Sequence, residues 1–275
     1  MFSDQHIEEL EIRLVLEAIH ARYGYDFRGY ALESMRRRLH VALTKSRSAH
    51  LGELQHRLLT EPALFSELLD DLTVQVSAMF RDPGFYLAFR REVVPILRTY
   101  PELKIWHAGC ASGEEVYTTA ILLAEEDLYE RAQLYATDVS TTALTRAREG
   151  IYDTNVFESS RQGYVDAGGV GRFDDYYSTA YGKSVVREGL KKNVVFFQHD
   201  LASDYAFGEM HVIFCRNVLI YFGDPLRAKV FHTFAGGLRR GGFICLGQTE
   251  RIPTSLDAFT EFCPKQRIYR HRGVS

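Results

Sequence analysis

Residues 103–113 read LKIWHAGCASG, an apolar segment followed at once by a loop with two glycines. Residues 104–107 are a strand candidate, and Gly109 and Gly113 permit a tight turn and the close approach of a ligand to the backbone. A helical pattern from Glu114 to Glu126 follows, and a second apolar segment, residues 134–136, leads to Asp138. Strand, glycine turn, helix and strand form a βαβ unit, which predicts a parallel sheet.

The glycine loop alone is compatible with a dinucleotide, another nucleoside or no ligand. A strict G-x-G-x-x-G pattern is absent, which disfavours an NAD site, and no G-K-[ST] follows, which excludes a P-loop. Asp138 ends its strand, where nucleoside-binding sheets place an acid that accepts hydrogen bonds from ribose; a helix cap is the alternative role. Glu115 lies in the first helical turn, where it either complements the helix dipole or holds a ligand ammonium group.

The flanking sequence extends this pattern in both directions. Four helices are predicted upstream, at residues 4–23, 31–46, 51–59 and 63–76, the first with a buried face of Ile7, Leu10, Leu14, Val15 and Ala18. Downstream we predict a helix at 224–238 and strands at 194–197, 211–214, 243–246 and 266–271. Residues 151–193 interrupt the alternation. There we expect an insertion with a small hairpin between residues 184–186 and the stretch near Asn193, which either covers a site or is an irregular surface excursion.

Composition narrows the classes of function. The chain has 275 residues and a net charge of −3, so a global basic field for nucleic acid is absent. A secretory leader and an apolar run of membrane-spanning length are not recognisable, and we expect a cytoplasmic protein that does not insert into a membrane. The four cysteines show no C-x-x-C spacing, which predicts buried, reduced thiols and no metal site.

Four segments together resemble the chemotaxis-receptor methyltransferase (CheR) family. They are VSAMFRD at 76–82, HAGCASGEE at 107–115, ATDVS at 136–140 and FCRNVLIYF at 214–222, in the family's order. The resemblance implies an α/β fold, with a doubly wound, mostly parallel sheet of the S-adenosylmethionine-dependent methyltransferase type and a small all-helical N-terminal domain. The implied boundaries are 1–73 for the helical domain, 74–102 for a linker and helix contributing to the cofactor site, and 103–275 for the methyltransferase domain.

The resemblance also implies a set of site residues. Glu115 would hold the methionine end of S-adenosylmethionine and Asp138 its ribose. Further cofactor contacts would come from the linker, the glycine loop and the ends of two later strands: Gln75, Ser77, Arg81, Gly109, Gly113, Asp200, Leu201, Asn217 and Val218. Gln75 and Ser77 stand where the family usually has Asn and Thr.

The implied reaction transfers the methyl group of S-adenosylmethionine to glutamate carboxylates of a chemoreceptor's cytoplasmic helical region or of a similar signalling protein. Its products are the glutamate methyl ester and S-adenosylhomocysteine. Arg81 and Tyr221 are the candidate catalytic residues. Arg81 would orient the acceptor carboxylate, with a structural ion pair to Asp82 or a sheet-edge acid as the alternative. Tyr221 would add a hydrogen bond or simply pack. Arg36, Arg37 and Arg38 are consecutive on one predicted helix, so at most part of the run can face one partner. They either dock onto acidic receptor helices or form a solvated face.

Other functions remain open from the sequence. One is a methyltransferase for a small molecule or nucleic acid, which would need a base or a metal near its nucleophile. Another is a non-catalytic cofactor-binding scaffold, and an NAD-dependent dehydrogenase ranks third. We expect a monomer with no nucleic-acid partner.

Overall fold

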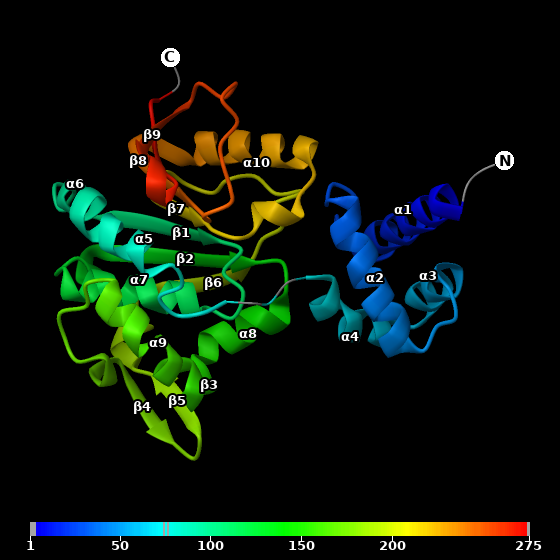
Figure 1. Ribbon diagram of the computed structural model, residues 1–275, viewed down its shortest axis with the longest axis horizontal. Coiled ribbons are helices and arrows are strands. Elements are labelled where there is room, and N and C mark those ends of the chain that lie inside the picture. The colour runs from blue at the N-terminus through cyan, green and yellow to red at the C-terminus, as the bar shows by residue number, and fades with distance from the viewer. Residues whose placement is uncertain (1–3, 74, 76, 274–275) are drawn as a thin grey trace. The chain divides into compact units, whose positions relative to one another are not determined.

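The computed structural model describes residues 4–73, 75 and 77–273, and their backbone forms two compact units (Figure 1). The helical unit contains the N-terminal helices together with residues 200–205 and 219–231. The sheet unit contains the remainder of the chain from Gln75 onward.

The helical unit begins with four helices: α1 (Asp4–Tyr23), α2 (Leu32–Ser46), α3 (Leu51–Thr60) and α4 (Pro62–Leu72). All four were predicted, but α4 ends at Leu72, and Val76, where we placed its end, lies outside the described residues. The predicted inner face of α1 is only partly right. Val15 and Ala18 are buried, whereas Ile7, Leu10 and Leu14 are about half exposed, at 48%, 57% and 47%. The helix instead buries a neighbouring stripe that includes Ile12, Leu16 and Ile19.

The sheet unit is built on seven strands in the order β6-β2-β1-β7-β8-β10-β9. The strands are β1 (Leu103–Ala108), β2 (Ala132–Asp138), β6 (Val194–Gln198), β7 (Met210–Cys215), β8 (Leu238–Leu246), β9 (Phe259–Cys263) and β10 (Ile268–His271). β6, β2, β1, β7 and β8 pair in parallel, while β10 is antiparallel to both β8 and β9. The mostly parallel sheet is therefore confirmed, although β9 was not predicted.

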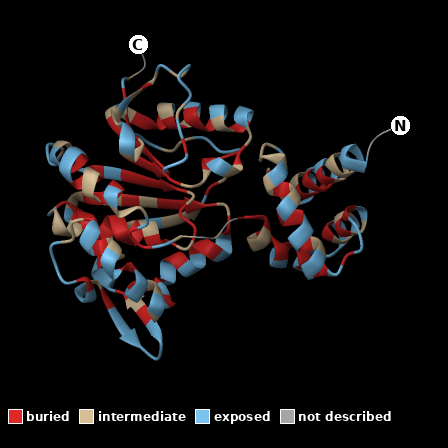
Figure 2. Cartoon of the chain, viewed as in Figure 1, coloured by how far each residue is buried: buried red, intermediate tan, exposed pale blue. Residues whose placement is uncertain are grey.

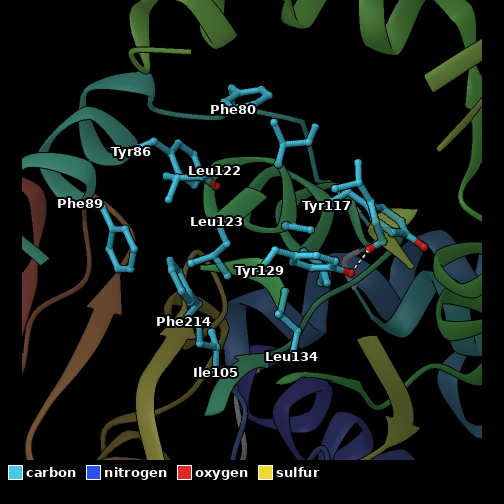
Figure 3. Close-up of a cluster of buried hydrophobic side chains, with 14 of the residues drawn as sticks. Phe80, Tyr86, Phe89, Ile105, Tyr117, Leu122, Leu123, Tyr129, Leu134 and Phe214 are labelled. Atoms are coloured by element: carbon cyan, nitrogen blue, oxygen red, sulfur yellow. Dashed lines mark hydrogen bonds between the residues drawn. The ribbon is translucent and has the colours of Figure 1, made fainter. Parts of the chain in front are cut away.

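Helices cover the sheet and complete its core. They are α5 (Pro83–Ala88), a π-helical turn at 89–93, α6 (Val94–Leu97), α7 (Glu114–Glu125), α8 (Thr141–Glu149) and the last part of α10 (Asp224–Gly237), of which residues 232–237 belong to this unit. On one face Phe89 packs on Phe214 of β7, with ring centroids 5.4 Å apart, within the cluster of Figure 3. Trp106 points to the opposite face of β1 and contacts Phe234 of α10, with centroids 5.4 Å apart. Phe214 and Trp106 are both fully buried, so the sheet around β1 is covered on its two faces and forms the centre of the unit.

The insertion at 151–193 folds differently from our expectation. It contains β3 (Ile151–Asp153), α9 (Thr154–Asp166), β4 (Tyr177–Ala180) and β5 (Lys183–Val186), with strand order β3-β5-β4. The hairpin joins β4 to β5 through Tyr181 and Gly182, both of which have positive φ, and it is largely exposed (Figure 2). The stretch after Asn193 is not a hairpin strand, because β6 pairs with β2 in the main sheet.

Candidate cofactor and active site

The predicted site lies at the carboxyl ends of three adjacent strands. The glycine loop follows β1, Asp138 ends β2 and Asn217 follows β7. β1 pairs with β2 on one side and β7 on the other, so the chain order reverses between β1 and β7. In open α/β sheets, ligands bind in the crevice outside the strand ends at such a reversal. The topology thus brings together the glycine loop, Asp138 and Asn217.

Both loop glycines are required by close contacts. Gly109 has a φ of +80°, and a Cβ added there would lie 2.6 Å from Cγ2 of Val218. Gly113 has a φ of +91°, and an added Cβ would lie 2.9 Å from the Cβ of Ala147 in α8. The loop is fixed by the amides of Gly109 and Cys110, which both donate to the carbonyl of Thr137 at 2.8 Å. Gly109 and Val218, two of the predicted cofactor residues, are therefore in direct contact.

Asp138 is a buried carboxylate held by the backbone. One oxygen accepts from the amide of Ala111 at 2.9 Å and the other from Ser140 at 3.0 Å, and the side chain of Gln75 also donates to it. Burial raises the pKa of Asp138, although these hydrogen bonds act in the opposite direction. The cap of α8 comes from Ser140, whose hydroxyl accepts from Ala143. Asp138 is thus not the cap of that helix and keeps acceptor capacity at the strand end.

Glu115 belongs to a chain of four charged or polar side chains. Its carboxylate lies 3.3 Å from Nδ1 of His107 and accepts from Arg216 at 2.9 Å. The same guanidinium donates to Asp82 at 2.8 Å. Burial alone would raise the pKa of Glu115, but the hydrogen bond with His107 and the charge of Arg216 hold it below its ordinary value. Glu115 is consequently an anion at neutral pH.

The linker segment turns sharply around Arg81. Phe80 and Asp82 both have left-handed backbone conformations, with φ of 52° and 56°. The amide of Phe80 donates to the hydroxyl of Thr118 in α7 at 3.1 Å, which ties the turn to the helix that carries Glu115. Arg81 is exposed and forms no ion pair with Asp82, whose carboxylate is used by Arg216. The alternative of an ion pair between Arg81 and Asp82 is therefore wrong. Gln75 and Ser77 are half-buried.

A second backbone anchor forms after β7. Asn217 has a φ of 61°, and its amide donates to the buried carboxylate of Glu250 at 2.8 Å. The amide of Gly247 donates to the same oxygen at 2.6 Å. A Cβ on Gly247 would lie 2.7 Å from the side-chain nitrogen of Asn217, so the end of β8 supports this position closely. Asn217 and Val218 are thus held beside the glycine loop.

The other three predicted residues, Asp200, Leu201 and Tyr221, belong to the helical unit. Asp200 accepts from the amides of Ala202 and Asp26 at 2.8 and 3.4 Å, and burial raises its pKa. Leu201 is buried. Tyr221 lies under a guanidinium, because the Cζ of Arg38 is 4.6 Å from its ring centroid.

The three successive arginines of α2 have separate roles. Arg38 is buried and donates to the carbonyl of Leu72. Arg36 forms ion pairs with Glu8, Glu9 and Glu33. Arg37 alone is exposed. The three side chains therefore do not share one surface, as expected for consecutive helical positions, and the docking role of this segment stays a prediction.

Two residues of the site were missed by sequence reasoning: His107 and Arg216. Both lie within the segments that carry the family resemblance, so the positions were visible but their roles were not. A histidine inside an apolar strand and an arginine directly after one are the signals that could have found them, since buried charges require partners.

Neither a membrane span nor a metal cluster is present in the described parts of the chain. No helix within residues 4–73, 75 and 77–273 is long and apolar enough to cross a bilayer. The same residues contain no group of three or more His, Cys, Asp or Glu side chains that could hold a metal ion.

The doubly wound sheet, the glycine loop and the acids after β1 and β2 define a nucleoside-binding α/β protein, and family comparison identifies it as an S-adenosylmethionine-dependent methyltransferase. Residues 75–268 match the model described as CheR methyltransferase, SAM binding domain, and residues 10–73 match CheR methyltransferase, all-alpha domain. The chain belongs to the CheR methyltransferase family.

Relatives in several bacteria share most of this length. The chain is 45% identical to Cher3 of Pseudomonas putida, a proposed methyltransferase, over 95% of this chain and 97% of that protein. It is 30% identical to the chemotaxis protein methyltransferase of Listeria innocua, over 85% of this chain and 87% of the relative. The same identity and coverage relate it to chemotaxis protein methyltransferase 1 of Pseudomonas aeruginosa.

Proposed function

We propose that this protein transfers a methyl group from S-adenosylmethionine to glutamate side chains in the cytoplasmic helical region of a chemoreceptor or a related signalling protein. The observation that carries the proposal is the gathering of Asp138, Glu115 and the Arg81 turn around one glycine loop. Asp138 and the loop are joined by the 2.9 Å bond to Ala111. Glu115 and the Arg81 turn are joined through Arg216.

The residues present fit the cofactor. The ligand would carry an ammonium group, for which Glu115 offers an anionic oxygen, and ribose hydroxyls, for which Asp138 offers acceptors. Gly109 leaves the backbone free of a side chain where Val218 already fills the space a Cβ would need. Bound S-adenosylmethionine supplies a methyl group activated by its sulfonium.

The chain's own residues have modest chemical tasks in this reaction. A glutamate acceptor has a reference pKa of about 4.3 and is ionised at neutral pH, so the protein needs no general base. Arg81 offers a guanidinium that binds a carboxylate through two parallel hydrogen bonds and can orient the acceptor. Catalysis then comes from holding the reactants in line and excluding water.

The test combines cofactor binding with methyl transfer. Asp138→Ala should abolish cofactor binding in calorimetry, whereas Arg81→Ala should retain most of the affinity and lose turnover. Turnover is followed as alkali-labile label transferred from methyl-labelled cofactor to receptor fragments, with glutamine in place of the acceptor glutamates as the control substrate. Equal cofactor affinity in Asp138→Ala and wild type contradicts the ribose assignment. Label that resists alkali contradicts glutamate esterification.

A further inference from the structure

Arg216 is a buried arginine that connects two parts of the proposed site. Its side chain is 1% exposed. Nη1 donates to Glu115 at 2.9 Å, and Nη2 donates to Asp82 at 2.8 Å and approaches the carbonyl of Arg81 at 3.4 Å. The guanidinium stacks on Phe85, with its Cζ 4.2 Å from the ring centroid. One planar group therefore spans from the start of α7 to the turn that presents Arg81.

The burial of Arg216 determines how strongly its charge depends on its partners. Removing a guanidinium from water is costly unless charged partners and hydrogen bonds compensate for it. Although burial opposes the charge, Tyr86, Glu115 and Asp82 together raise the pKa of Arg216, so the group stays cationic. The two carboxylates are more accessible than the arginine, with side chains 18% and 32% exposed for Glu115 and Asp82. Arg216 is thus the buried centre of this network, and its two acids are the more exposed groups.

The turn around Arg81 needs such an anchor. Two left-handed non-glycine residues, Phe80 and Asp82, flank Arg81. Each residue held in a sparsely populated backbone region costs on the order of 1–3 kcal/mol and persists only where the surroundings impose it. The Phe80 amide is held by Thr118, and the Asp82 carboxylate is held by Arg216. Without Arg216 the second of these two restraints is lost.

We propose that Arg216 is a positioning residue that sets Glu115 and the Arg81 turn in a fixed mutual geometry, so that cofactor and acceptor carboxylate meet their charged partners together. The inference rests on the proposed function. It predicts that Arg216 acts on cofactor affinity through Glu115 and on turnover through Asp82. The two routes can be separated by substitution.

The principal variant is Arg216→Met, which keeps much of the length of the side chain and removes its charge. A matched control is Arg90→Met. Arg90 is also a buried arginine that bridges two acids, but its partners, Glu125 and Glu126, lie at the far end of α7. Each purified full-length variant is compared with wild type by thermal melting, by calorimetric titration with S-adenosylmethionine and by steady-state methyl transfer. Arg216→Met should weaken cofactor affinity at least tenfold, and Arg90→Met should change it by less than about threefold at a comparable loss of melting temperature.

A double-mutant cycle distinguishes positioning from general stabilisation. If Arg216 acts through Glu115, Arg216→Met combined with Glu115→Gln binds the cofactor no more weakly than Glu115→Gln alone. Asp82→Asn, which breaks only the other connection, should lower kcat at least fivefold while the cofactor dissociation constant changes by less than threefold. Arg216→Lys keeps the charge without the fork and should recover part of the affinity lost in Arg216→Met.

Several outcomes overturn the inference. The inference fails if Arg216→Met binds the cofactor with wild-type affinity. It fails equally if the effects of Arg216→Met and Glu115→Gln on affinity multiply in the cycle, or if Arg90→Met loses as much affinity as Arg216→Met. Should Arg216→Met not fold, the Arg216→Lys and Asp82→Asn variants decide, and unchanged kcat in Asp82→Asn counts against the proposal. Failure of the proposed function is a separate result, because wild-type protein would then bind no cofactor or form no ester.

Discussion

Substitution of Gly109 by alanine should destabilise the sheet unit by an amount set by two separable causes. The residue has a φ of +80°, and an L-residue in that region costs about 1–2 kcal/mol. The new Cβ would also lie 2.6 Å from Cγ2 and 3.2 Å from Cγ1 of Val218. Overpacking of this kind costs about 1–3 kcal/mol. We therefore expect Gly109→Ala to lower the free energy of unfolding by about 2–5 kcal/mol, a large part of a typical total.

The chain provides a suitable probe for this measurement. Trp106 is its one tryptophan, is fully buried and lies in the strand that leads to Gly109. Its fluorescence during urea titration gives the free energy of unfolding of the surrounding sheet. Val218→Ala removes both methyl groups that meet the new Cβ, so it should recover the overpacking part in the double variant and leave the backbone part. A coupling energy of about 1–3 kcal/mol between the two positions is expected.

Gly236 offers a matched control. It lies in α10, its φ is outside the left-handed region, and an added Cβ would meet no atom within 4 Å. Gly236→Ala should be neutral or stabilising by up to about 1 kcal/mol. Unchanged stability of Gly109→Ala, or strictly additive effects with Val218→Ala, would refute the reasoning from contact and backbone conformation.

Three further predictions concern other parts of the sheet unit. Ser140→Ala removes the cap of α8 and should cost about 1 kcal/mol in the same urea titration, whereas Thr141→Ala should cost less. Burial alone would raise the pKa of Glu125, but hydrogen bonds from Tyr164, Gly171 and Tyr176 and the charge of Arg90 hold it below the ordinary value of 4.5. The contribution of Glu125 to stability is therefore present above about pH 4.5 and lost as the pH falls below that value. Acidification should then lower the melting temperature of Glu125→Gln less than that of wild type. Equal losses of melting temperature in the two proteins would contradict this. Burial raises the pKa of the Cys110 and Cys215 thiols, so these two residues should resist alkylation by iodoacetamide in the native protein at neutral pH and react fully only after unfolding, as mass spectrometry of their peptides would show. Cys263 was expected to be buried but is only partly so, and its peptide is the internal comparison.

The sheet was predictable from the sequence because its signals are local. Each parallel strand is a short apolar run bounded by a turn, and the residues that end β1 and β2 are a glycine loop and an acid. In the helical unit the helices could be predicted, but the face that each helix buries could not always be identified. In α1 two neighbouring stripes are apolar, one through Leu10 and one through Ile12, and the periodicity cannot say which of them packs inward. Only the tertiary contacts of α1 decide that question.

The insertion and the charge network escaped prediction for a different reason. The hairpin turn at Tyr181 and Gly182 has a weak turn signal, since tyrosine rarely adopts positive φ. The pairing of Arg216 with Glu115 and Asp82 joins residues about 100 and 130 positions apart, which no periodicity reports. The residues at the strand ends could be placed from motifs, but the contacts between their side chains could not.

The helical unit has a consequence for how the protein is made. The amide of Ala31 donates to the carbonyl of Tyr221 at 2.9 Å, and that of Gly223 donates to Gly29 at 2.8 Å. These late residues leave the ribosome roughly 150 positions after α4, on the order of ten seconds or more at ordinary rates of synthesis. The first four helices must wait for that returning segment before their packing is complete. Exchange of N-terminal domains between relatives would likewise have to transfer residues 200–205 and 219–231 with the helices, because a cut at residue 73 divides one compact unit.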